Sequence, residues 1–184
     1  MRCPIARTKL TSAMLRVAIN GCAGMIVCTA LASPPAKPPA VESVRPCRLA
    51  VFVNDPDPAG LNLRREPGSE GQIVNTVVDG DAMLDVTGSR GKWLRVERVR
   101  GADGTVQFEG EAWAFGPLTA VRAKRTVALH AAAQQTSSTT ATMPAEQIGA
   151  VQACDAMWVR VRHGKSSGWM APDAHCGNAV TDCV

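Results

Sequence analysis

Cysteine and histidine are the residues of this sequence that could do the most chemistry, since thiolates are nucleophiles and both side chains bind metal ions. A thiol hydrolase would combine one of two cysteines with one of three histidines, namely Cys154, Cys176, His130, His163 and His175. No two of the seven cysteines have the C-x-x-C spacing of structural zinc sites. We therefore expect no metal site.

A run of acidic and turn-forming residues nearly matches a calcium-binding EF-hand loop. It begins with Asp55 and Asp57, and Glu66 is its twelfth residue. Ala59, however, stands where such a loop needs Asp or Asn, two prolines stiffen the segment, and its flanks alternate like strands. We expect a tight turn here and no bound calcium.

The N-terminus has the three parts of a secretory signal. Residues 1–16 contain four basic residues and no acidic one, an apolar stretch runs from Leu15 to Leu31, and Ala30-Leu31-Ala32 is an A-x-A cleavage motif. We expect a cleavable signal peptide over residues 1–32 and a proline-rich linker over residues 33–46. An uncleaved anchor or a lipoprotein is the alternative. The mature protein would have no membrane span and would be periplasmic or secreted.

Loss of this signal removes the excess positive charge of the chain. The full sequence has 20 basic and 16 acidic residues, and the signal holds four of the basic ones. A neutral mature chain lacks the basic surface on which nucleic-acid binding rests. We therefore expect no nucleic-acid partner.

Four cysteines remain in the mature chain, Cys47, Cys154, Cys176 and Cys183. An even number of cysteines in an exported protein predicts two disulfides, for which three pairings are possible. Oxidised cysteines cannot supply the thiolate that nucleophilic catalysis requires. We therefore expect a protein that is not an enzyme and has no cofactor.

The elements that position these residues are expected to be β-strands. Residues 48–53 are mostly apolar, and Leu61–Arg64 alternates apolar and polar side chains. Trp93–Glu97 combines aromatic and β-branched residues with polar alternates. Gly-, Asp- and Pro-rich turns separate these runs, so the sequence predicts an all-β protein.

The sequence also repeats itself at an offset of 65–66 residues. Leu61–Arg64 aligns with Val127–His130, and Trp93–Val96 aligns with Trp158–Val161. The first copy carries an insertion, Arg100–Glu109, which the second lacks. Two similar units therefore follow one another along the chain.

Each unit resembles the bacterial SH3 domain. In the first, the matching residues are Gly60-Leu61-Asn62-Leu63-Arg64 with Pro67 and Gly68, then Trp93-Leu94-Arg95-Val96, then Trp113. In the second they are Trp158-Val159-Arg160-Val161 and Gly168-Trp169-Met170-Ala171-Pro172, whereas Ala128 and His130 replace Asn62 and Arg64. The resemblance implies two tandem SH3-like β-barrels, at residues 47–121 and 122–184.

The resemblance also implies a binding function in the cell envelope. The expected ligand is peptidoglycan or an envelope protein, and the candidate contact residues are Arg64, Arg65, Glu66 and Trp113. The absence of Tyr argues against the polyproline groove of eukaryotic SH3 domains. The alternative is a structural or inhibitory subunit that docks one specific periplasmic protein. The oligomeric state is left open.

Within two such barrels, Trp93, Trp158 and Trp169 are expected in the cores, since each lies inside a strand pattern. The low-complexity segment from Ala131 to Thr142 is expected to form a flexible loop.

The disulfide pairing has two leading candidates within this arrangement. The preferred pairs are Cys154–Cys176, which would lie within the second unit, and Cys47–Cys183. The alternative joins Cys176 with Cys183, which are close in the sequence, and leaves Cys47 with Cys154.

Overall fold

The structure is a computed structural model that describes residues 42–179. This part of the chain consists of β-strands and two short 3-10 helices, with no α-helix, which confirms the all-β prediction. The strands are β1 (Arg45–Val53), β2 (Leu61–Arg64), β3 (Ile73–Val77), β4 (Met83–Arg90), β5 (Trp93–Arg100), β6 (Val106–Phe115), β7 (Thr119–Ala123), β8 (Val127–His130), β9 (Thr139–Met143), β10 (Ile148–Asp155), β11 (Trp158–His163), β12 (Ser166–Met170) and β13 (His175–Cys176). The 3-10 helices are Gly116–Leu118 and Pro172–Ala174.

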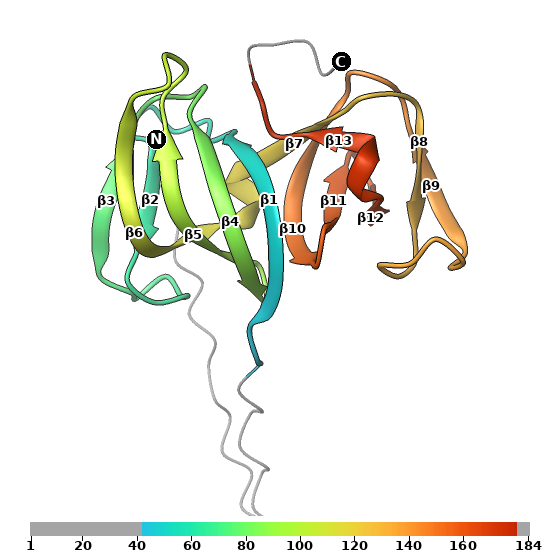
Figure 1. Cartoon of the computed structure of the whole chain (residues 1–184), viewed down its shortest axis with the longest axis horizontal. Helices are drawn as coiled ribbons and strands as arrows, with labels where there is room; N and C mark the ends of the chain where they lie inside the picture. The colour runs from blue at the N-terminus through green and yellow to red at the C-terminus, as the bar shows by residue number, and fades with distance from the viewer. Residues whose placement is uncertain (1–41, 180–184) are drawn as a thin grey trace, which may run out of the picture. The chain divides into compact units, whose positions relative to one another are not determined.

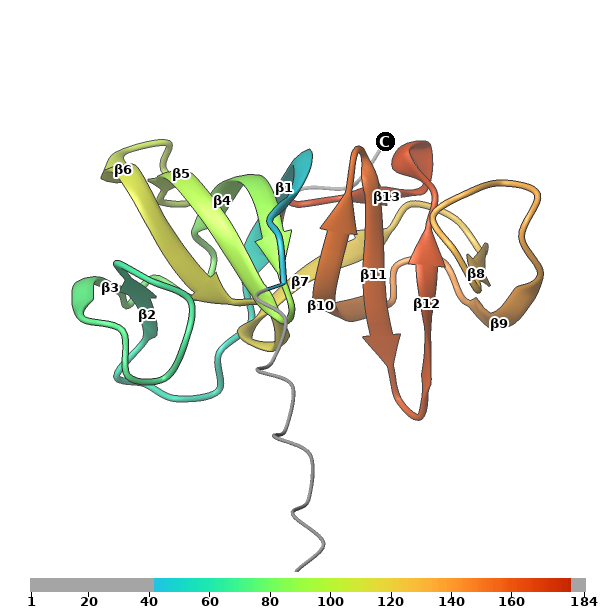
Figure 2. The same cartoon turned by 90° about the horizontal axis from the view of Figure 1, so that it is seen from below.

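The strands are connected in one continuous hydrogen-bonded path. Its order is β3-β2-β6-β5-β4-β1-β7-β10-β11-β12-β8-β9, and β13 pairs with β7 outside this path. We call β1–β6 the first barrel and β8–β13 the second barrel (Figure 1). Seen from below, β10, β11 and β12 lie side by side in the second barrel (Figure 2), as their antiparallel pairing requires.

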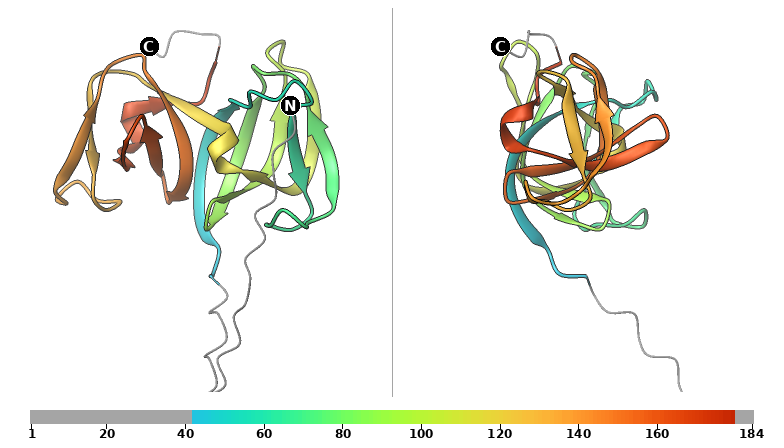
Figure 3. Two further views of the ribbon diagram at one scale, coloured as in Figure 1. Left: turned by 180° about the vertical axis from the view of Figure 1, so that it is seen from behind. Right: turned by 90° about the vertical axis from the view of Figure 1, so that its right-hand side faces the viewer.

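β7 belongs to both barrels. It pairs with β1 through Phe52 and Ala120, and with β10 through Val121 and Gly149. The pairing pattern repeats in the two barrels. β1 begins the first barrel and pairs with β4, and β7 precedes the second barrel and pairs in the same way with β10. The view from behind shows β1 beside β4 (Figure 3). The predicted domain ranges would divide β7 between residues 121 and 122, and they remain a prediction.

Alternation along the strands builds the core of each barrel. In β2, Leu61 and Leu63 are fully buried, and the polar residues between and after them are half-buried. In β8 of the second barrel, Val127 and Leu129 are buried in the same way. Period-two burial is what a strand with one face on a core requires, so both predicted strands are confirmed.

The tryptophans do not fill the cores as predicted. Trp169 is buried, with 7% of its surface exposed, but Trp93 and Trp158 are only half-buried. Each of these two begins its strand, and the next residue, Leu94 or Val159, is the one that is fully buried. The prediction for Trp93 and Trp158 is therefore wrong, because their side chains lie on the strand face opposite the core.

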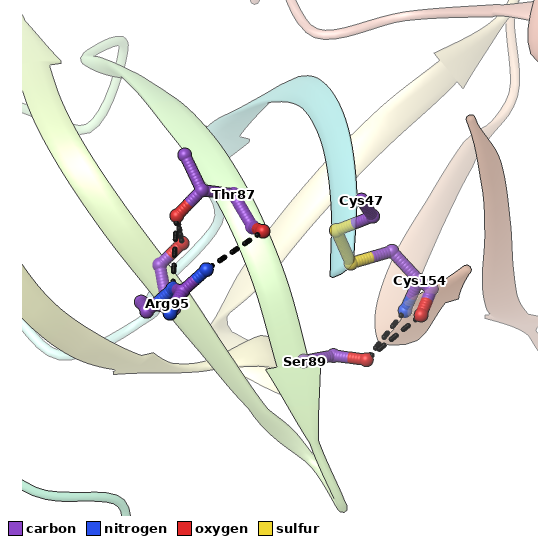
Figure 4. The surroundings of a disulfide bond; sticks show 5 residues. All are labelled: Cys47, Thr87, Ser89, Arg95 and Cys154. Carbon is purple, nitrogen blue, oxygen red and sulfur yellow. Dashed lines mark hydrogen bonds between the residues drawn. A yellow bond between two sulfur atoms is a disulfide. The ribbon is translucent and has the colours of Figure 1, made fainter. Parts of the chain in front are cut away.

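The preferred disulfide pairing is also wrong. The structure joins Cys47 to Cys154 across 107 residues of sequence, with a Cα–Cα distance of 5.8 Å (Figure 4). The reason is a backbone contact between segments far apart in the sequence, in which Arg48 N–H donates to the Ala156 carbonyl at 2.8 Å and Ala156 N–H donates to the Pro46 carbonyl at 3.0 Å. This contact holds the start of β1 against the end of β10.

One cysteine of a second disulfide lies within the described residues. Cys176 is also disulfide-bonded, and Cys183 lies outside the described residues. The predicted signal peptide and most of the linker lie outside them as well. Within residues 42–179, no helix has the length and apolar character needed to cross a membrane.

The segment from Ala131 to Thr142 is partly a strand. Its last four residues belong to β9, which pairs with β8 through Ala128 and Thr142. The turn before β9 is closed by Ser137, whose hydroxyl donates to the Ala132 carbonyl at 3.1 Å. The prediction of a flexible loop over this whole segment is therefore wrong for its last four residues.

Candidate functional site

The first barrel carries an open groove of about 350 Å³, which we call the first-barrel groove. Aromatic and aliphatic side chains line it together with acidic, amide, hydroxyl and basic groups. The lining residues are Asp55, Asp57, Gly60, Leu61, Asn62, Arg64, Ser69, Trp93, Phe115 and Leu118. A mostly apolar cleft with a few polar groups is typical of ligand sites.

Two aromatic rings form the apolar part of this groove. Trp93 is the first residue of β5 and Phe115 the last of β6, and the two are cross-strand partners. Their ring centroids are 5.3 Å apart and their planes are inclined by 53°. Both side chains are half-buried, so part of each ring remains open to a ligand. Such a pair offers a large contact area with few rotatable bonds.

The acidic side of the groove is an ordered turn before β2. The Asp55 carboxylate accepts the Asp57 N–H at 3.0 Å, and the Asp57 carboxylate accepts the Ala59 N–H at 2.9 Å. The turn ends at Gly60, whose φ of +89° would be unfavourable for any residue with a Cβ. A Cβ there would also lie 2.9 Å from the Cα of Val78. The sequence thus forms a tight turn at this place, as predicted.

The described part of the chain contains no cluster of side chains that could bind a metal ion. Among residues 42–179, no group of three or more His, Cys, Asp and Glu side chains is placed to hold an ion. In the acidic turn, the carboxylate oxygens of Asp55 and Asp57 instead accept backbone N–H groups.

Of the four predicted contact residues, the structure brings Arg64 to the groove. Its guanidinium donates to the Gly71 carbonyl at 2.6 Å and so holds the loop between β2 and β3 against the strand. Arg65 is exposed and donates to the Gln72 side chain at 3.1 Å. Neither Arg65 nor Glu66, which is also exposed, lines the groove.

Trp113, the fourth candidate, is buried beside the groove. Only 5% of its surface is exposed, and the Arg90 guanidinium lies 5.2 Å from the centre of its ring. Trp113 is the cross-strand partner of Arg64 but does not line the groove. The position that does offer an aromatic face is Trp93.

The second barrel has different chemistry at the equivalent place. Ala171 aligns with Phe115, so Trp158 has no aromatic partner of that kind. Instead the His130 and Trp158 rings meet in a T-shaped arrangement, with a centroid distance of 5.6 Å and an angle of 89°. His130 is fixed in turn by a 3.1 Å hydrogen bond between Nδ1 and the Ser137 carbonyl. The two barrels are therefore not equivalent as binding surfaces.

Sequence reasoning missed Trp93, Phe115 and the two aspartates as groove residues. A signal for Trp93 was present in the alternation of β5, because Leu94 and Val96 form an apolar face and Trp93 falls on the polar one. Phe115 carried no comparable signal, since its contact with Trp93 depends on the pairing register of two strands.

Comparison with solved structures finds distant similarities, two of them to NlpC proteins. The structure of NlpC1 from Trichomonas vaginalis has a TM-score of 0.30 and 10% sequence identity, over 73% of this chain and 48% of that one. The structure of NlpC2 from the same organism has a TM-score of 0.29 and 9% identity, over 70% of this chain and 47% of that one. This chain thus spans about half the length of either protein. A search of the curated proteins finds no match.

Comparison with protein families gives two matches to one family. The bacterial SH3 domain matches residues 57–109 and again residues 123–173. The first match contains β2 to β5 and the second contains β8 to β12, so each barrel accounts for one match. Together they cover more than half of the chain and confirm the resemblance found in the sequence. The chain therefore belongs to the bacterial SH3 domain family, as a tandem of two domains.

Proposed function

We propose that this protein is an exported binding module of the cell envelope and that the first-barrel groove is its ligand site. The observation that carries the proposal is the half-open pair of Trp93 and Phe115, flanked by charged side chains of both signs. Bacterial SH3 domains are binding modules, and this groove gives the first barrel a surface with which to bind.

The chemistry of the groove favours peptidoglycan as the ligand. Aromatic rings stack on the apolar faces of sugars and on extended peptides. Asp55 and Asp57 would attract an amino group, whereas Arg64 would attract a carboxylate. A peptide stem on a glycan strand carries all of these features within a short distance.

Export is supported by the disulfide between Cys47 and Cys154. Such bonds form and persist outside the reducing cytoplasm. The N-terminal signal pattern predicts the same route. A binding role without catalysis agrees with the disulfide-bonded state of Cys154 and Cys176, which removes both candidate nucleophiles from thiolate chemistry.

The test is sedimentation of the purified mature protein with peptidoglycan sacculi. We expect the native protein to pellet with the sacculi and Trp93→Ala to lose affinity by at least about tenfold, since truncating an aromatic hot spot costs roughly 2 kcal/mol. Trp158→Ala is the matched control, because Trp158 begins the equivalent strand of the second barrel and is also half-buried. Thermal unfolding of both variants checks that they fold.

The outcomes separate the two candidate functions. Equal sedimentation of the native protein and Trp93→Ala would exclude the first-barrel groove as the site. A native protein that does not sediment, but co-purifies with one envelope protein, would favour the alternative of a structural or inhibitory subunit. Exposed Ile73, Val78 and Val106 on the first barrel, at 47%, 73% and 57% exposure, are the apolar residues such a partner could cover.

A further inference from the structure

A second groove of about 400 Å³ lies where residues of both barrels meet, and we call it the inter-barrel groove. Its lining is mostly polar and includes side chains from β1, β4, β10, β11 and β12. The lining residues are Glu42, Arg45, Ser89, Gly91, Lys92, Gln152, Ala153, Arg160, Ser167 and Trp169.

Three cations and one acid give this groove its charge. Arg45, Lys92 and Arg160 are all exposed, and Glu42 is the acidic residue of the lining. Arg45 and Glu42 form an ion pair at 3.8 Å, with 50% and 53% of their side chains exposed. An exposed pair at this distance contributes about 0–1 kcal/mol, so solvent or a ligand can separate it.

The Glu42 carboxylate lies beside the turn between β4 and β5. A Cβ at Gly91 would be 3.4 Å from Glu42 Oε2, and Gly91 has the positive φ of +57° that suits such a turn. Lys92 follows directly. The groove therefore already holds one carboxylate, supplied by the chain itself, beside Arg45.

The opposite wall adds a guanidinium beside an aromatic ring. Arg160 of β11 and Trp169 of β12 are cross-strand partners, so their side chains share one face. Arginine binds carboxylates through a planar fork of donors. The Gln152 amide and the Ser167 hydroxyl supply further hydrogen-bonding groups to the same groove.

The two walls are fastened to each other. Ser89 lines the groove from the first barrel, and its hydroxyl donates to the Cys154 carbonyl at 2.8 Å and accepts the Cys154 N–H at 3.1 Å. Cys154 is in turn bonded to Cys47 (Figure 4). A preorganised groove binds with a smaller entropy cost than one that must be assembled.

We propose that the inter-barrel groove binds carboxylate groups of an acidic peptide segment, and that Glu42 competes with them as an internal carboxylate. The site is separate from the first-barrel groove, with which it shares no lining residue. A carboxylate is favoured over other anions because the groove accommodates one in the structure.

The test is calorimetric titration of the mature protein with hexaglutamate, with hexaglutamine as the neutral peptide. Only hexaglutamate should bind, and high salt should abolish binding because the cations are exposed. We expect Lys92→Gln and Arg160→Gln each to weaken binding about 2- to 5-fold, and Glu42→Gln to strengthen it about 2- to 3-fold. Lys165→Gln, at the β11–β12 turn outside the groove, removes the same charge and should change little.

Several results would overturn this proposal. Failure of hexaglutamate to bind, or equal affinity in Arg160→Gln and the native protein, would exclude the groove. Tighter binding of inorganic phosphate than of hexaglutamate would exclude the carboxylate class. An unchanged affinity in Glu42→Gln would exclude the internal competitor. Trp93→Ala should retain native affinity for hexaglutamate, which distinguishes this site from the first-barrel groove.

Discussion

His175 on β13 is a titratable side chain held in an environment that disfavours its charge. Burial lowers the pKa of His175 below its ordinary value of 6.5, the backbone of Met157 opposes this with a hydrogen bond, and the charge of Lys124 lowers the pKa further. Its Nε2 is buried without a hydrogen-bond partner. The folded protein therefore prefers the neutral imidazole.

This preference makes stability depend on pH. Below pH 6.5 the unfolded chain binds a proton at His175 that the folded chain resists, so the free energy of unfolding should fall as the pH drops through that value towards the lower folded-state pKa. Denaturant unfolding at a series of pH values measures this slope. His175→Gln should flatten it, whereas His163→Gln should leave it in place. A slope that persists in His175→Gln would contradict the prediction.

Asp173 adds an effect of opposite origin, because its carboxylate is stabilised in the charged form. The hydrogen bond from Arg125, at 2.7 Å, lowers the pKa of Asp173 below its ordinary value of 3.8. Its stabilisation is complete above that value and is lost only as the pH falls below it. Between pH 3.8 and pH 6.5 Asp173 therefore adds nothing to the slope that His175 produces.

At the scale of elements, the chain after β13 returns to β1. A Cβ added at Gly177 would overlap the Ala50 carbonyl and lie 2.7 Å from Val51 N, so this segment packs directly on the β1 backbone. Arg122 of β7 donates to the Ala179 carbonyl nearby, at 3.3 Å. Close backbone packing of this kind admits only glycine.

Gly177→Ala should therefore destabilise the protein by about 1–3 kcal/mol, the usual cost of forcing extra volume into a packed site. Gly80→Ala is the matched control, because a Cβ at Gly80 would meet nothing within 4 Å and its φ is not left-handed. We expect that control to be neutral or stabilising by up to about 1 kcal/mol. Chemical denaturation measures both, and equal stabilities of the two variants would contradict the packing argument.

The elements show what the sequence could and could not predict. The repeated patterns at Trp93–Val96 and Trp158–Val161 correctly predicted β5 and β11, because alternation is a local property. The alternation also marks Leu94 and Val96 as the apolar face of β5, so the error at Trp93 came from reading an aromatic residue in a strand as a core residue. The Cys47–Cys154 bond was not predicted as the preferred pair, since it depends on a non-local contact between β1 and Ala156.

The shared strand was beyond prediction for a related reason. The sequence divides into two repeats of similar length, and nothing local to residues 119–123 indicates that one strand pairs with both neighbours. Which strands pair depends on contacts between segments that are far apart in the sequence. In this chain β1 and β10 each present an edge to β7.

At the scale of the whole molecule, β7 and the Cys47–Cys154 bond tie the two barrels together. Val121 of β7 is fully buried, and β7 forms ladder pairs with strands of both barrels. A disulfide that spans 107 residues further restricts the unfolded chain. Neither barrel can then lose its fold without exposing apolar surface and breaking ladder bonds in the other.

We therefore expect the barrels to unfold in one cooperative transition. Leu129→Ala, in the core of the second barrel, should lower the free energy of unfolding by about 2–5 kcal/mol. Native-state hydrogen exchange should show the same decrease in the protection free energy of the β5 amides in the first barrel. Leu63→Ala, in the core of the first barrel, should lower the protection of β11 in return. If each substitution reduced protection only within its own barrel, the barrels would be independent folding units. Equal losses of protection in both barrels would instead mean that β7 couples them, so that the inter-barrel groove opens only when the whole protein unfolds.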